Sequence, residues 1–78
     1  MRKIELGELV EIFWVDAKAF SNEWLAIGEV KSFNPERCST GGYIIHEDAE
    51  SYYVAMTKGE GCFHNIFLIP KGCVKEIR

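Results

Sequence analysis

The chain has 78 residues, and its nine Lys and Arg against twelve Asp and Glu give a formal net charge of -3 at pH 7. A chain of this length is expected to form one small domain, residues 1–78, with little stability to spare, because even a domain of roughly 60 residues buries only about 60% of its unfolded surface. The acidic balance disfavours general nucleic-acid binding, since such proteins carry a basic patch. A hydrophobic content of 47% with 13% aromatic residues disfavours disorder.

The N-terminal sequence MRKIELGELV has no long apolar region and no small-residue cleavage site, and no window approaches ~18 uninterrupted apolar residues. The sequence therefore predicts a cytoplasmic protein without a membrane span. Three cysteines, Cys38, Cys62 and Cys73, are an odd number in a chain without a secretory signal. We expect reduced, partly buried thiols and no disulfide framework.

The first strand is predicted over residues 8–17, where β-branched and aromatic residues dominate. Val10, Ile12 and Trp14 share one face, and the opposite face is also largely apolar. A strand that is apolar on both faces is typical of the middle of a fold or of a subunit interface. We therefore expect Trp14 to be a core or interface anchor.

A short helix is predicted near residues 22–31, because Asn22 can cap a helix start and the following apolar residues approximate a period of 3.6. Gly28 weakens the middle of this helix. The pair Asn34-Pro35 then predicts a turn, since the residue before proline is disfavoured in the helical region.

Three further strands are predicted from Gly41 to Ile69, separated by polar turns at residues 47–51 and 59–61. The glycine-rich stretch Thr40 to Gly42 is interpreted as turn chemistry. Together these runs predict a meander of antiparallel strands.

The stretch Pro70 to Gly72 predicts a 3₁₀ turn, because Pro70 cannot donate to a sheet and Lys71-Gly72 permits a tight turn. A fifth strand is expected over residues 73–77. The sequence therefore predicts a mainly all-β fold: a small, strongly bent, five-stranded antiparallel barrel with one short helix.

The run Ile69 to Val74 resembles the closing segment of Src-homology-type small barrels, and also the last two strands of Sm-like proteins, which assemble into rings. Cys73 stands where the first family has a groove aromatic, and Pro70 and Lys71 stand where the second has its RNA-binding Arg-Gly pair. The resemblance therefore implies the fold, and neither proline-peptide nor RNA recognition.

Over its whole length the sequence resembles small proteins of unassigned activity that tailed phages and prophages encode. The resemblance rests on Trp14 to Ala17, a Trp-containing short segment, Gly42 to Ile44, and the ending Ile69 to Ile77. It implies a phage-type source and a small β-fold.

Cys62 and His64 have the right chemistry for zinc or for a Cys–His nucleophile, with Cys38 and His46 elsewhere. Paired cysteine knuckles are absent, however, and no sequence feature marks an oxyanion hole. The carboxylates of residues 46–50 lack the spacing of a calcium loop. We therefore predict no catalytic residue, no metal site and no cofactor.

The aromatic residues exceed what one thin barrel interior buries, since only one face of each strand points inward. Either of two features can cover the remaining aromatic side chains: the predicted helix over one face, or a homo-oligomeric or partner interface. The interface is assigned to Phe13, Trp14, Trp24 and Tyr53. The expected function is a non-catalytic, homo-oligomeric binding or accessory protein whose partner is a host or phage protein.

An alternative is a protein that sequesters a small anionic ligand such as a nucleotide between subunits. This alternative requires Lys58, Lys71, Lys75 and Arg78 to line a pocket between the subunits.

Overall fold

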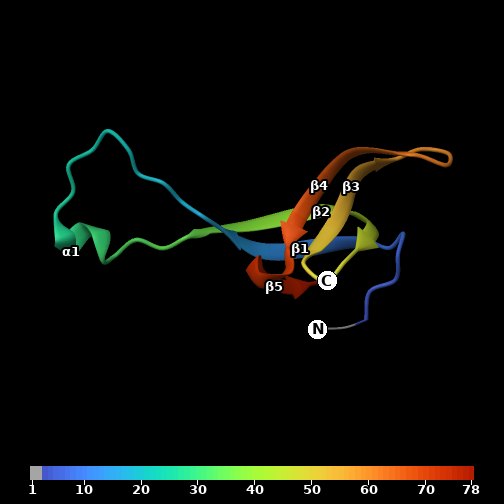
Figure 1. Ribbon diagram of the computed structural model, residues 1–78, viewed down its shortest axis with the longest axis horizontal. Coiled ribbons are helices and arrows are strands. Elements are labelled where there is room, and N and C mark those ends of the chain that lie inside the picture. Colours follow the sequence, from blue (N-terminus) through green and yellow to red (C-terminus); the bar gives the residue numbers. More distant parts are fainter. Residues whose placement is uncertain (1–2) are drawn as a thin grey trace.

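The computed structural model describes residues 3–78 as a curved β-sheet with a long projecting arm (Figure 1). The elements in chain order are β1 (Leu9–Asp16), α1 (Ile27–Val30), β2 (Glu36–Glu47), β3 (Ser51–Lys58), β4 (Phe63–Pro70), the 3₁₀ turn η1 (Lys71–Cys73) and β5 (Val74–Ile77). The predicted mainly-β fold of five antiparallel strands is confirmed.

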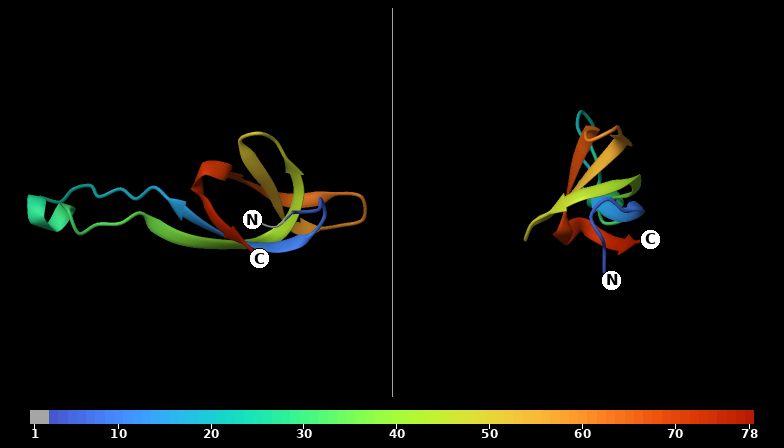
Figure 2. Two further views of the ribbon diagram at one scale, coloured as in Figure 1. Left: turned by 90° about the horizontal axis from the view of Figure 1, so that it is seen from below. Right: turned by 90° about the vertical axis from the view of Figure 1, so that its right-hand side faces the viewer.

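The strands form one sheet in the order β4-β3-β2-β1-β5. The long strand β2 pairs with β1 from Glu36 to Tyr43 and with β3 from Tyr43 to Glu47, so the sheet bends along β2 and curls over itself (Figure 2). Among the described residues, β4 and β5 are edge strands. The sheet is not closed, and the predicted barrel is therefore not confirmed.

The glycines of β2 lie inside the strand. The prediction of a turn at Thr40 to Gly42 is wrong, and so is the prediction that the second strand begins at Gly41, because β2 runs from Glu36 without interruption. Glycine is needed at position 42 because the backbones of β2 and β3 approach closely there. A Cβ on Gly42 would lie 2.6 Å from the carbonyl oxygen of Ala55. The residue that looks like a turn signal lets β2 bend against β3.

The helix is much shorter than predicted. Only Ile27–Val30 is helical, whereas residues 22–31 were expected. Asn22 has a φ of 64°, which is outside the right-handed helical region, so it begins no helix. No residue of α1 is buried. The helix lies at the far end of residues 17–35, which we call the arm, and it covers no face of the sheet (Figure 1).

The core is small and lies between the curved halves of the sheet. Its buried residues are Val10, Ile12, Ile44, Tyr52, Val54, Ile69 and Ile77, with Ile4, Trp14 and Val74 partly buried against them. The shared face of Val10, Ile12 and Trp14 thus points into the core. Leu9, on the opposite face, is 64% exposed.

The turn between β2 and β3 is organised by Asp48. Its carboxylate accepts the backbone N–H groups of Glu50 and Ser51, each at 2.8 Å, and the hydroxyl of Tyr53 at 2.9 Å. These hydrogen bonds hold the pKa of Asp48 below its ordinary value of 3.8. The charged carboxylate therefore stabilises the folded state.

The substitution Asp48→Asn is expected to reduce stability at neutral pH by removing this charge while keeping an acceptor oxygen. Because the folded pKa is lower than the unfolded pKa, the stabilisation is present above pH 3.8 and is lost as the pH falls through the folded value. The difference between wild type and variant should therefore shrink in acid. Denaturant unfolding at pH 7 and pH 2 measures it, and an equal difference at both values would contradict the assignment.

The closing turn lies one residue later than predicted, with η1 at Lys71–Cys73 and β5 at Val74–Ile77. Lys71 ties this turn to the rest of the sheet, since its Nζ lies 2.6 Å from Oε2 of Glu47 and its backbone N–H donates to the carbonyl of Glu50. The hydrogen bond to Glu47 raises the pKa of Lys71. Of the residues that the structure describes, none belongs to a helix long and apolar enough to cross a membrane.

Candidate functional site

The arm is held together by aromatic stacking. The rings of Phe20 and Phe33, from its outgoing and returning limbs, lie 4.2 Å apart at 17°. At the base of the arm, Lys18 Nζ lies 3.2 Å from Glu36 Oε2. The two limbs therefore stay together although no strand pairing joins them.

The far end of the arm exposes apolar side chains. Trp24 is fully exposed, Ile27 is 71% exposed, and Val30 is also exposed. We call Glu23 to Val30 the arm tip. It carries the carboxylates Glu23 and Glu29, and an exposed lysine follows at position 31. An exposed tryptophan beside an isoleucine is typical of a contact surface.

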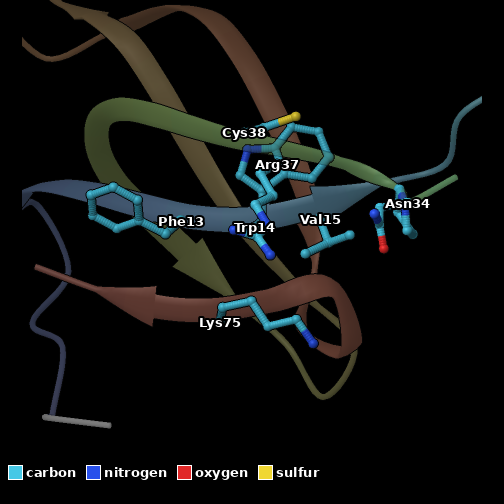
Figure 3. A pocket seen from close by; sticks show the side chains of 8 residues that line it. Phe13, Trp14, Val15, Asn34, Arg37, Cys38 and Lys75 are labelled. Carbon is cyan, nitrogen blue, oxygen red and sulfur yellow. The ribbon is translucent and has the colours of Figure 1, made fainter. Parts of the chain in front are cut away.

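A cavity of about 560 Å³ lies at the base of the arm, where β1, β2 and β5 meet (Figure 3). We call it the base pocket. Its lining residues are Phe13, Trp14, Val15, Asn34, Pro35, Arg37, Cys38 and Lys75. Three consecutive residues of β1 contribute because the pairing of β1 with β5 is irregular between Phe13 and Trp14. The pocket is mostly apolar and falls within the size range of binding pockets, roughly 300–1,000 Å³.

Two cations line the base pocket. Within the described part of the chain, neither Arg37 nor Lys75 has a carboxylate partner. Figure 3 shows the Lys75 side chain extending from β5 toward the end of the pocket where Val15 lies. The pocket therefore combines an apolar lining with unpaired positive charge.

A second exposed apolar surface follows the β3–β4 hairpin. Its members are Met56, Phe63, Ile66, Phe67 and Leu68. Strand β4 is exposed on both faces, and only Ile69 near its end is buried. Asn65 has a φ of 57°, which locally distorts the strand.

The four predicted interface residues lie in three places. Phe13 and Trp14 line the base pocket, and Trp24 lies at the arm tip. Tyr53 lies beside the β2–β3 turn, where its hydroxyl donates to Asp48 and its ring contacts His46 edge-on with centroids 4.9 Å apart. The hydrogen bond to Asp48 raises the pKa of Tyr53. One chain does not bring these four residues together.

Sequence reasoning missed the base pocket and the stacking that supports the arm. Arg37, Pro35 and Phe33 were not assigned to any site. The available signal was the length of the connection, because loops longer than roughly 12–15 residues are uncommon in compact domains and are usually either functional or linker segments. Because a helix was predicted over residues 22–31, this segment did not look like a long loop.

The cysteines and histidines that suggested metal or thiol chemistry lie apart. Cys62 is exposed, which contradicts the expected partial burial, whereas Cys38 and Cys73 are half-buried; all three are free. Over residues 3–78, no group of three or more His, Cys, Asp or Glu side chains is placed to hold a metal ion.

Comparison of the chain with protein-family models, curated proteins and solved structures finds no match in any of the three.

Proposed function

We propose that the protein is a non-catalytic binding or accessory protein that acts through protein–protein contacts as a homo-oligomer. The main support for this proposal is the large solvent-accessible surface of the chain, which exceeds that of a compact monomer of the same mass. The chain exposes 5910 Å², whereas a compact monomer of 8.9 kDa exposes about 4,800 Å². The excess of about 1,100 Å² exceeds the roughly 800 Å² that each partner buries in a standard interface.

The extended shape supports the same proposal. The radius of gyration is 15.9 Å, while a compact chain of this length has about 11.5 Å. The arm accounts for the difference, because it projects along the 52 Å long axis (Figure 2). Exposing apolar side chains on the arm to water is unfavourable for a monomer, whereas an oligomer can bury them.

The arm tip also requires a partner on energetic grounds. Isolated helices shorter than roughly 12–15 residues are marginal in water, and α1 has four residues, none of them buried. A protein surface that covers Trp24 and Ile27 supplies the missing packing.

The anionic-ligand alternative has less support, because its four cations lie apart. Lys71 is paired with Glu47, Arg78 with Glu76, and Lys58 lies over the ring of Tyr43. Of the four, only Lys75 lines the base pocket.

The phage-type role and the host or phage protein partner rest on the sequence resemblance alone. The β3–β4 apolar surface is separate from the arm, so self-assembly through the arm leaves it free for such a partner.

Light scattering at micromolar concentration tests the proposal. We expect a mass that is a multiple of 8.9 kDa. A mass equal to that of one chain throughout the micromolar range would refute the homo-oligomer.

A further inference from the structure

We propose that the base pocket receives the arm tip of a second copy of this chain, so that two copies exchange arms reciprocally. This inference rests on the proposed homo-oligomer and names its contact surface. The occupant of the pocket is thus a defined segment, Glu23 to Val30, of an identical chain.

Geometry favours this occupant. The arm extends away from its own base pocket, so within one chain the tip and the pocket lie at opposite ends of the arm (Figures 1 and 3). When two arms lie side by side about a two-fold axis, they run antiparallel, and each tip lies beside the base of the other arm. The same contact then forms twice, as in closed dimers.

The surfaces match in polarity. The tip presents Trp24 and Ile27, both without cover in one chain, and the pocket presents Phe13, Trp14 and Val15. Burying a tryptophan removes about 150–250 Å² from water. Trp24 therefore accounts for about 150–250 Å² of the surface by which each chain exceeds a compact monomer, and Ile27 and the pocket lining add to this area.

The surfaces also match in charge. Arg37 and Lys75 at the pocket lack carboxylate partners, and the tip brings Glu23 and Glu29. The tip thus has a formal charge of -2, and Lys31, which follows it, brings residues 23–31 to a net charge of -1. Glu29 already accepts the backbone N–H of Ala26 at 3.4 Å, which leaves Glu23 as the carboxylate adjoining Trp24. A cation of the pocket next to Glu23 orients the tip as it enters.

The first experiment measures dimer affinity by light scattering or sedimentation across a concentration series of the full chain. Trp24→Ala is expected to weaken the dimer more than tenfold, since buried interface tryptophans are frequent hot spots. Arg37→Glu is expected to weaken it as well, and adding Glu23→Arg to that variant should restore part of the loss. Phe63→Ala, which truncates an exposed aromatic of the β3–β4 surface, is the matched control and should change the affinity less than twofold.

The second experiment uses Cys38 in the base pocket as a reporter. Exposed Cys62 is first replaced by Ser to remove background. Ala26→Cys then places a thiol at the arm tip, and mild oxidation should give a covalent dimer in which that thiol is joined to Cys38 of the other copy. Ala49→Cys, at an alanine that is also exposed and lies on the β2–β3 turn, is the control and should give no such linkage.

The outcomes separate the two proposals. A monomeric wild type refutes the homo-oligomer and the arm exchange together. A wild-type oligomer that neither Trp24→Ala nor Arg37→Glu weakens, and that forms no linkage to Cys38, overturns only the arm exchange. Saturable binding of ATP to a monomer, abolished by Arg37→Glu, would assign the base pocket to a small anion and would also overturn it.

Discussion

The substitution Gly42→Ala is expected to abolish the cooperative fold. A Cβ at this position would lie 2.6 Å from the carbonyl oxygen of Ala55 and 2.6 Å from Cγ1 of Val54. The carbonyl belongs to the paired strand β3, so it cannot move away without breaking the β2–β3 pairing around Tyr43 and Ala55. Inserting a methyl group into a packed site costs up to about 3 kcal/mol, and more where backbone must shift.

The neighbouring glycine provides a matched control. A Cβ on Gly41 meets only the carbonyl oxygen of Val10, at 4.0 Å, so Gly41→Ala adds no clash. This variant should be as stable as the wild type or more stable by about 0.4–1 kcal/mol, because alanine has fewer unfolded conformations. Thermal unfolding by circular dichroism compares the two. Equal melting temperatures for both alanine variants would mean that β2 is not held against β3 at Gly42.

The strands could be predicted because their signals are local. The β-branched and aromatic residues of β1, the polar turn before Ser51 and the break at Pro70 are signals from near neighbours in the chain, and each marks an element of the structure. The bounds move by only one residue at η1 and β5.

The bend in β2 could not be predicted from its own residues. The pair Gly41-Gly42 has the composition of a turn, and only the approach of Ala55, from another strand, explains why glycine is needed inside a strand. A contact between residues 13 positions apart leaves no local signature. The same limit applies to closure of the barrel, which depends on two edge strands, β4 and β5, meeting in space.

The interface assigned to Phe13, Trp14, Trp24 and Tyr53 stays a prediction. The surplus of aromatic residues indicates apolar surface that one chain leaves exposed, and Trp24 is fully exposed. Its arrangement depends on the arm, and the arm is held by the stacking of Phe20 on Phe33, 13 residues apart. The helical period near Trp24 therefore predicts a longer helix than the chain forms, because a short helix is stable only where packing supports it.

The substitution Trp14→Ala is expected to unfold the protein or leave it barely stable. The indole packs against the core, lies 5.6 Å from the ring of Phe67, and donates from Nε1 to Oγ1 of Thr40 at 2.9 Å. Truncating a buried Trp to Ala costs about 3–5 kcal/mol, and the half-buried position of Trp14 favours the lower value. A domain this small has a total stability of only about 5 kcal/mol.

Two variants show whether the loss of stability in Trp14→Ala comes from removing the ring or from removing its hydrogen bond. Trp14→Phe keeps an aromatic ring near Phe67 and loses the donor to Thr40, so it should cost only about 1 kcal/mol. Trp24→Ala makes the same truncation at a fully exposed ring, and at concentrations where the chain is monomeric it should leave the melting temperature unchanged. If Trp14→Ala were soluble and melted cooperatively at the wild-type midpoint, the packing of β1 against β4 through Trp14 and Phe67 would not stabilise the fold.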